Sequence, residues 1–259
     1  MGITSEKMKM SNEDVIRRQK EDIRRRVWSN MEEAHVARFP LPVHGRIPNF
    51  EGAEIAAEKL SETQNFLKAK TVFCSPDSPQ RSIRSITLKE GKTLIMASPR
   101  LRDDFIQLEP GCLDPKTYSE ASTIVGAFKY GRRVRPSDIK IDFKITGSVA
   151  VTVDGGRVGK GGGYSDIEYG LLREFNCINE RTPIATTVHD LQVVVWVPMD
   201  PTHDMPLDVI ATPTRLIQTR TKIKRPQGIR WDLLPDEKID AIPLLEVLRR
   251  SQKQDRKLP

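Results

Sequence analysis

The chain has few cysteines and no long apolar run. Its 259 residues include three cysteines, Cys74, Cys112 and Cys177, which are far apart and form no Cys-x-x-Cys pair. This spacing argues against a disulfide framework and against a zinc site, so we expect buried free thiols. No segment approaches the roughly 18 apolar residues that span a bilayer, and no apolar run follows the first basic residues, as it would in a signal peptide. We therefore expect a cytoplasmic protein.

The charge of the chain is moderately basic. It has 42 Lys and Arg against 35 Asp and Glu, a formal net charge of +7. A basic excess attracts anions in general, including nucleotides, polyglutamate tails and nucleic acid. The excess is concentrated between Arg17 and Arg26 and between Arg215 and Arg230. Composition alone leaves a nucleotide-binding enzyme and an RNA-binding protein as alternatives.

Helical and strand-like segments alternate along most of the chain. This alternation predicts an α/β fold with a mainly parallel sheet and crossover helices. We divide the chain into an α/β domain over residues 1–212 and a basic extension over 213–259, which packs on that domain or trails from it. Helices are expected over 12–34, 51–69, 80–90, 164–175 and 236–251, and strands over 70–74, 93–97, 143–153, 184–188, 193–197 and 208–211.

The most informative segment is a glycine-rich loop over residues 154–166, between an expected strand and an expected helix. Its glycines allow backbone amides to approach phosphate oxygens, and the helix start adds partial positive charge. Arg157 and Lys160 supply full charges. Gly161 follows Lys160 where a P-loop has Ser or Thr, and the dinucleotide fingerprint also fails. A tight turn followed by a flexible loop is the alternative interpretation.

This loop resembles the signature of a known family. The sequence Arg-Val-Gly-Lys-Gly-Gly-Gly-Tyr-Ser-Asp over residues 157–166 is similar to the Arg-Leu-Gly-Arg-Gly-x-Gly-Tyr-Tyr-Asp motif of 5-formyltetrahydrofolate cyclo-ligases, also called methenyltetrahydrofolate synthetases. Weaker landmarks follow in the family's order over roughly residues 15–212. The resemblance implies a three-layer αβα sandwich and the conversion of 5-formyltetrahydrofolate and ATP to 5,10-methenyltetrahydrofolate, ADP and phosphate.

The resemblance also implies roles for individual residues. Arg157 and Lys160 would act at the transferred phosphate, and Asp166 and Asp204 would ligate Mg²⁺, which prefers carboxylate oxygens. Helix capping by Asp166 and a plain turn at Asp204 are the alternatives. The residues implied to contact ATP are Lys20, Arg24, Arg157, Gly159, Lys160, Gly161, Gly162, Gly163, Tyr164 and Ser165.

One segment departs from the family's pattern. The family has Glu-x-x-Thr after the second sheet strand, where the Glu helps to hold the folate, whereas residues 75–84 here contain Arg81 and Arg84. Arginine offers only donors and suits a phosphate or carboxylate. We therefore treat Arg81, Arg84 and Gln192 as candidate residues for an anionic substrate. A position of both arginines on a solvent-facing helix surface is the alternative.

Three functions remain open, of which the first is an ATP- and Mg²⁺-dependent folate cyclo-ligase. The second is an ATP-binding protein of the same fold with another anionic substrate, for which a thiamine-related compound is one option. The third is a non-catalytic RNA- or anion-binding module, although the chain has no RNP-type aromatic motif. We expect a small-molecule substrate, no membrane partner, and a monomer or a homodimer.

Overall fold

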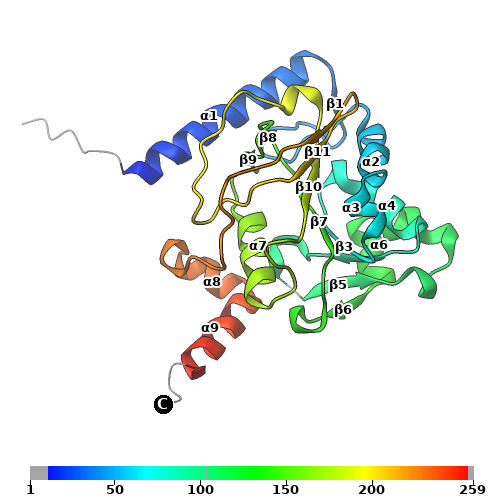
Figure 1. Cartoon of the computed structure of the whole chain (residues 1–259), viewed down its shortest axis with the longest axis vertical. Helices are drawn as coiled ribbons and strands as arrows, with labels where there is room; N and C mark the ends of the chain where they lie inside the picture. The colour runs from blue at the N-terminus through cyan, green and yellow to red at the C-terminus, as the bar shows by residue number, and fades with distance from the viewer. Residues whose placement is uncertain (1–10, 103, 256–259) are drawn as a thin grey trace, which may run out of the picture.

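A mixed eight-stranded sheet forms the centre of the computed structural model, which describes residues 11–102 and 104–255, with no side chain beyond Ser251 (Figure 1). The strand order is β12-β11-β10-β7-β3-β4-β5-β6. The strands are β3 (Thr71–Cys74), β4 (Thr93–Met96), β5 (Phe105–Leu108), β6 (Arg132–Val134), β7 (Phe143–Ile145), β10 (Ile184–Thr187), β11 (Val209–Ala211) and β12 (Leu216–Gln218), with the small pairs β1 (Ala37–Arg38) to β2 (Asn49–Phe50) and β8 (Ala150–Val151) to β9 (Arg157–Val158).

The five central strands are parallel, in the order β11-β10-β7-β3-β4. The strands β5, β6 and β12 add antiparallel edges. From β3 the chain continues to β4 on one side and later returns to β7 on the other side. The strand order therefore reverses between β3 and β7, and such a switch point opens a crevice at the carboxyl ends of the strands.

Helices cover both faces of the sheet, which confirms the expected α/β sandwich (Figure 1). The helices α7, α8 and α9 lie on one face, and α2 to α6 lie on the other. The helices are α1 (Asn12–Glu33), α2 (Ala53–Ser61), α3 (Gln64–Lys68), α4 (Arg81–Lys89), α5 (Tyr118–Ala121), α6 (Ile124–Tyr130), α7 (Tyr164–Glu174), α8 (Asp236–Ala241) and α9 (Pro243–Asp255). Short 3-10 turns η1 to η7 connect some of them, including η1 (Ser78–Gln80) and η6 (Asp190–Gln192).

Alternation within the strands divides the core into these two layers. Phe73 and Ile95 pack with the α7 side, while Val72 and Leu94 pack with the α4 side, as expected when successive side chains point to opposite faces. A third cluster joins α1 to the β8–β9 hairpin through residues such as Val27. The helix α1 therefore lies beside the glycine-rich loop, although it is far from it in the sequence.

The three cysteines are free. Burial raises the pKa of the Cys74 and Cys177 thiols to about 12. The expectation of buried thiols is thus right for these two and wrong for Cys112, which is exposed. Among the helices that the structure describes, none is long and apolar enough to cross a membrane.

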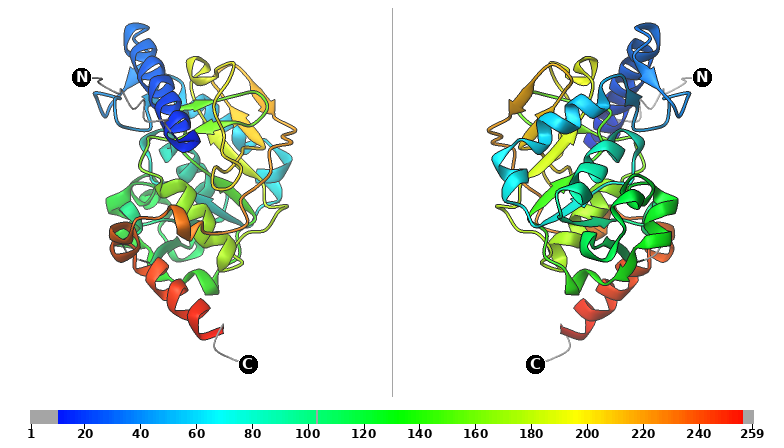
Figure 2. Two further views of the ribbon diagram at one scale, coloured as in Figure 1. Left: turned by 90° about the vertical axis from the view of Figure 1, so that its left-hand side faces the viewer. Right: turned by 90° about the vertical axis from the view of Figure 1, so that its right-hand side faces the viewer.

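The extension that begins at residue 213 contributes to the main core. Ile239, Ile242, Leu245 and Leu248 are buried in the same cluster as residues of α7. In Figure 2 the orange and red segment crosses the molecule and ends in α9 against the lower part of the domain. The extension is therefore part of the packed structure as far as α9.

We expect Leu245→Ala to lower the free energy of unfolding by about 2–5 kcal/mol, because it leaves a cavity beside α7. Val247→Ala on the same helix is the matched control, since Val247 is 56% exposed and surface substitutions change stability by about 0.5 kcal/mol or less. Urea unfolding of the full chain measures both variants. Equal midpoints would mean that α9 unfolds independently of the domain.

Candidate functional site

The glycine-rich loop joins β9 to the start of α7. Gly161 and Gly163 have φ angles of +99° and +71°, a region that side chains with a Cβ disfavour. Gly163 is also the N-cap of α7 and provides no side-chain oxygen to its first turn. Because the first amides of a helix lack intrahelical partners, the loop and the start of α7 together present donors suited to an anion.

A cavity of about 470 Å³ lies along this loop. Four segments that are distant in the sequence form its walls: α1, residues 157–167, residues 200–204 and residues 228–238. The carboxyl ends of β3 and β7 approach it through Asp77 and Gly147, which contact residues of the loop. The cavity is therefore at the switch point of the sheet.

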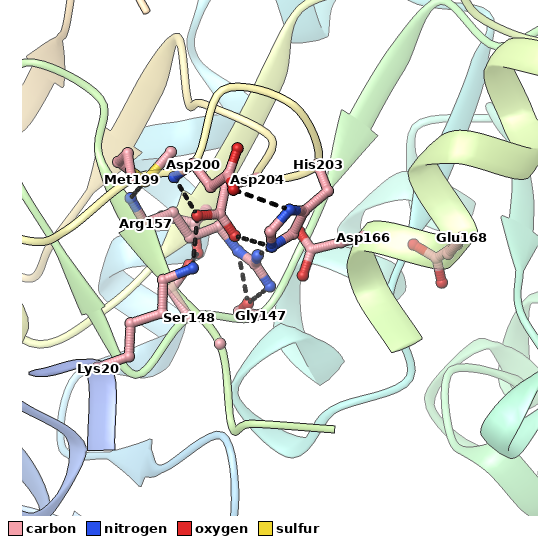
Figure 3. Close-up of polar contacts among 12 residues, drawn as sticks. Lys20, Gly147, Ser148, Arg157, Asp166, Glu168, Met199, Asp200, His203 and Asp204 are labelled. Atoms are coloured by element: carbon pink, nitrogen blue, oxygen red, sulfur yellow. Dashed lines mark hydrogen bonds and ion pairs between the residues drawn. The ribbon is translucent and has the colours of Figure 1, made fainter. Parts of the chain in front are cut away.

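Arg157 connects the loop to the sheet and to α7 (Figure 3). Its side chain is almost fully buried, and its Nε and Nη2 donate to Gly147 O at 3.2 and 2.9 Å. Its Nη1 pairs with Asp166 Oδ1 at 3.3 Å. The backbone N–H of Arg157 also donates to Met199 Sδ at 3.3 Å. This guanidinium lines the cavity, yet most of its donors already bind the protein.

A second polar cluster joins α1 to the 200–204 segment (Figure 3). Lys20 Nζ pairs with Asp204 Oδ2, and His203 Nε2 lies 3.5 Å from Asp204 Oδ1. Asp200 N donates to Asp204 at 2.7 Å. Burial alone would raise the pKa of Asp200, but hydrogen bonds from Thr202 and nearby positive charge outweigh it, so this pKa lies below its ordinary value. Asp200 is thus an anionic carboxylate at the cavity wall.

The remaining cations of the loop region also have partners. Arg24 Nε donates to Gly159 O at 2.7 Å, and its Nη1 pairs with Glu21 at 3.0 Å. Lys160 is 45% exposed and its Nζ pairs with Asp77 Oδ1 at 3.1 Å. The cationic groups are therefore held in place by the protein's own oxygens.

The structure brings together every residue that was predicted to contact ATP or Mg²⁺. The residues that line the one cavity are Lys20, Arg24, Arg157, Gly159, Lys160, Gly161, Gly162, Gly163, Tyr164, Ser165, Asp166 and Asp204. Their roles in ligand binding stay predictions.

The three predicted substrate residues do not line the cavity. Arg81 is exposed and donates to Ser119 O at 3.3 Å. Arg84 is buried, and its guanidinium donates to three backbone carbonyls, including Ser75 O at 2.6 Å. Gln192 is also buried, and its amide donates to Ser148 O and Val149 O. The hydrogen bonds of Arg84 and Gln192 thus connect loops of the fold.

Sequence reasoning missed Asp77, Asp200 and Lys238. Asp77 comes three residues after the end of β3, and an acid shortly after a buried parallel strand is a signal that we could have used. A Cβ on Gly147 would lie 2.8 Å from Asp77 Oδ2, so the missing side chain of Gly147 makes room for this carboxylate. Lys238 lies in the extension, and no pattern in the sequence pointed to it.

Polar atoms without a protein partner collect at the same strand ends. Ser75 Oγ, Gln80 Oε1 and Thr146 Oγ1 are buried, and no group among the described residues bonds to them. Ser75 directly follows β3 and Thr146 directly follows β7. Buried polar atoms are usually paired, so the switch point has hydrogen-bonding capacity that the rest of the fold does not use.

Behind the loop, a buried ion pair joins α7 to the sheet. Lys144 Nζ of β7 pairs with Glu168 of α7, and the ammonium lies 4.2 Å from the centre of the Phe73 ring. Burial lowers the pKa of Lys144 and raises that of Glu168, while the charge of each opposes the shift of the other. Neither residue of this pair lines the cavity, and the pair connects α7 to the sheet.

The carboxylates of the cavity could hold Mg²⁺ together with a phosphate ligand. No group of three or more His, Cys, Asp or Glu converges as a metal site within residues 11–102 and 104–255. Asp166, Asp200 and Asp204 nevertheless line the same cavity, and Asp166 offers a second oxygen beside the one facing Arg157. Mg²⁺ is commonly held by one or two carboxylates together with substrate phosphates, so these residues suit a metal that arrives with a phosphate ligand.

The fold and the cavity define an α/β protein with a cavity lined by cationic side chains near the carboxyl ends of its parallel strands. The model of the 5-formyltetrahydrofolate cyclo-ligase family matches residues 4–213. The chain is also 39% identical to a methenyltetrahydrofolate synthase domain-containing protein of Bos taurus and 40% identical to one of Mus musculus, each over 240 residues. The chain belongs to the 5-formyltetrahydrofolate cyclo-ligase family.

The match to these relatives covers 91% of this chain and 63% and 64% of theirs. The chain therefore spans less than two thirds of the length of the curated relatives it matches. Among solved structures, the NMR structure of Aquifex aeolicus 5,10-methenyltetrahydrofolate synthetase is 21% identical, with a TM-score of 0.48, and the match covers 83% of this chain and 99% of that one.

We expect Lys160→Ala to weaken Mg-ATP binding by about ten- to a hundredfold, the worth of a charged hydrogen bond. The fold should persist, because this half-exposed side chain contributes little to the core. Lys89→Ala removes an exposed lysine far from the cavity and is the matched control. Isothermal titration measures both variants, and an unchanged ATP affinity in folded Lys160→Ala would reject a phosphate-binding role for this lysine.

We expect Asp166→Asn to raise the Mg²⁺ concentration needed for half-maximal ATP binding, because an amide oxygen is a weaker ligand for a hard cation than a carboxylate. Asp240→Asn serves as the control, since Asp240 is an exposed carboxylate of α8 that does not line the cavity. Titrating Mg²⁺ at fixed ATP gives the measurement. The same Mg²⁺ dependence in wild type and Asp166→Asn would show that Asp166 is not a ligand.

Proposed function

We propose that this protein is an ATP- and Mg²⁺-dependent enzyme that closes 5-formyltetrahydrofolate to 5,10-methenyltetrahydrofolate. The main support is the convergence of Lys20, Arg24, Arg157 and Lys160 with the amides of the glycine-rich loop around one cavity. Four cationic side chains and a helix start form an environment for a polyphosphate. Membership of the cyclo-ligase family supports the nature of the reaction.

The proposed chemistry transfers the terminal phosphoryl group of ATP to the formyl oxygen and releases ADP. Nitrogen N-10 of the folate then attacks the activated formyl carbon and loses its proton, and the oxygen leaves as phosphate. Such a transfer depends on holding the phosphates in line and neutralising their charge. Bound Mg²⁺ would supply part of that neutralisation, held by Asp166 with Asp204 or Asp200.

The cationic side chains would act by exchanging partners. Lys160 is bound to Asp77 and Lys20 to Asp204, and a phosphate that displaces either carboxylate gains a group that is already positioned. Pre-positioned charges need little rearrangement when negative charge develops. The carboxylates released in this exchange are then available to a metal or to the second substrate.

Asp77 favours the folate over a different anionic substrate. A pterin presents amino and ring N–H donors, which a carboxylate accepts and an arginine cannot. Asp77 lies in the loop after β3, where its carboxylate is beside Gly147 and pairs with Lys160 of the glycine-rich loop, and it would provide the acid that we did not find in the sequence of this segment. An anionic substrate held by Arg81 and Arg84 has no support from their positions, because Arg81 donates to Ser119 O on the exposed surface and the guanidinium of Arg84 already donates to three backbone carbonyls.

We propose that the protein works in the cytoplasm and acts on a small molecule. Its three cysteines are free, as is typical of reducing compartments. The basic extension does not by itself support an RNA-binding module, since Arg225 pairs with Asp208 and donates to Thr182 O at 2.7 Å. Part of its basic character therefore serves to attach the extension to the fold.

The test is to incubate the full chain with 5-formyltetrahydrofolate and Mg-ATP. We expect the absorbance of the conjugated methenyl product to appear together with an equal amount of ADP. Omitting ATP or adding a chelator should abolish both signals. Binding of Mg-ATP without any product would reject the folate and leave a nucleotide-binding protein that acts on another substrate.

We expect Asp77→Asn to raise the KM for 5-formyltetrahydrofolate by about ten- to a hundredfold, because a charged acceptor is lost. The KM for ATP should stay the same or fall, because Lys160 is released from its ion pair. Asp240→Asn, an exposed carboxylate of α8, is the control. Steady-state kinetics separates the two constants, and an equal rise of both would mean that Asp77 only supports the loop.

A further inference from the structure

The extension forms one wall of the cavity. Residues 228–230, 233–235 and 238 line it together with the glycine-rich loop. The match to the family model ends at residue 213, so this wall is made by a segment outside the family's own sequence pattern. Part of the ligand environment in this chain is therefore added to the family core.

The wall is attached to α7 by close packing. Ile229 N donates to Glu174 Oε1 at 3.0 Å. A Cβ on Gly170 would lie 2.5 Å from Ile229 Cδ1, so the absence of a side chain at this position lets Ile229 approach the helix. Ile229 is partly buried against the main core, and Ile239 is buried within it. The segment between these two anchors is fixed beside the loop.

Lys238 is the residue of this wall that contacts the loop. Its Nζ donates to Gly162 O at 2.8 Å and lies 5.5 Å from the centre of the Tyr164 ring. A Cβ on Gly163 would be 3.1 Å from the same nitrogen. The ammonium thus lies directly on the segment whose amides begin α7.

Lys238 differs from the other cationic side chains of the cavity, because no carboxylate among the described residues pairs with it. Within the part of the chain that the structure describes, the cavity is lined by seven Lys and Arg side chains, and six of them pair with a carboxylate. Among the described residues Lys238 has a carbonyl and an aromatic ring as neighbours, and no ion pair. The six pairs are Arg17–Asp14, Lys20–Asp204, Arg24–Glu21, Arg157–Asp166, Lys160–Asp77 and Arg230–Asp232.

We propose that Lys238 is a further ligand-binding residue, whose ammonium contacts the phosphate chain of the bound nucleotide from the extension. An ammonium has three donors, and the bond to Gly162 O uses one, which leaves two for phosphate oxygens. No carboxylate has to be displaced first, in contrast to Lys160 and Lys20. This inference rests on the proposed nucleotide site, and it adds to that site a residue that the family pattern does not include.

The position of Lys238 on the glycine-rich loop favours a contact with the phosphates of the nucleotide over a contact with its base or with the pterin. Gly162 lies between Lys160 and Tyr164, in the segment whose amides suit an anion. A contact to the adenine or to the pterin would not need a full positive charge. Lys238 should therefore affect the binding of a polyphosphate that carries no base.

The experiment compares variants of the full chain by titration with Mg-ATP and with Mg-tripolyphosphate. Lys238→Met removes the charge but keeps the length of the side chain over Tyr164, and Lys238→Arg restores the charge. Lys222→Ala is the matched control, because Lys222 is an exposed cation of the same extension that does not line the cavity. If Lys238→Met does not fold, Lys238→Gln takes its place.

We expect Lys238→Met to weaken the binding of both ligands by about tenfold. The difference in affinity from the wild type should be smaller at high salt, where charges are screened. Lys238→Arg should recover most of the affinity, and Lys222→Ala should bind like the wild type. Equal affinities of wild type and Lys238→Met would overturn this inference and leave the proposed function intact. A wild type that binds neither ligand would overturn both. Lys238-dependent binding of tripolyphosphate without folate turnover would reject only the proposed reaction.

Discussion

The buried guanidinium of Arg157 is the interaction on which the site depends. It binds Gly147 O at the end of β7 and Asp166 in the first turn of α7, and thereby fixes the glycine-rich loop between the sheet and a helix start. A buried charge is costly unless it is paired and hydrogen-bonded. The same hydrogen bonds that satisfy this charge therefore set the position of the loop amides. All three guanidinium nitrogens bond to the protein, so the main role of this side chain is to position the loop.

The electrostatic design of the cavity follows from this arrangement. Its cations line the same cavity, and like charges repel one another unless anions separate them. The carboxylates of Asp77, Asp166 and Asp204 provide that separation. Each pair couples the sheet, the loop or the 200–204 segment to another element, so a ligand that displaced one carboxylate would change contacts in a second segment. On the proposed function, an anionic ligand would thus be linked to the geometry at the switch point.

The sequence predicted the local elements better than the contacts between them. The helix expected over 12–34 matches α1 to within a residue, with Ser11 as its N-cap, and the glycine-rich loop located the cavity. The expected strand over 193–197 is wrong, because only Val193 forms a bridge, to Val151, and Val195 is fully exposed. Helix periodicity likewise missed Thr63, which caps α3 and divides the helix expected over 51–69. Where a strand or helix ends depends on capping and tertiary packing, which the periodicity of apolar residues does not reveal.

The substrate residues show why family patterns fail in a changed segment. Arg84 occupies a position where charge suggested a ligand, yet its neighbours after folding are the carbonyls of Ser75, Asp77 and Ser122. By fixing the Ser75 and Asp77 carbonyls, this arginine holds the turn that carries the Asp77 carboxylate beside Lys160. Arg84, whose charge suggested a ligand contact, thus has an indirect role. It supports Asp77, an acid that the comparison of this segment with the family's motif overlooked. Asp77 does not line the cavity itself, but it pairs with Lys160, which does. The proposed preference for a ligand with donors at this end rests on the acceptor oxygens of that carboxylate.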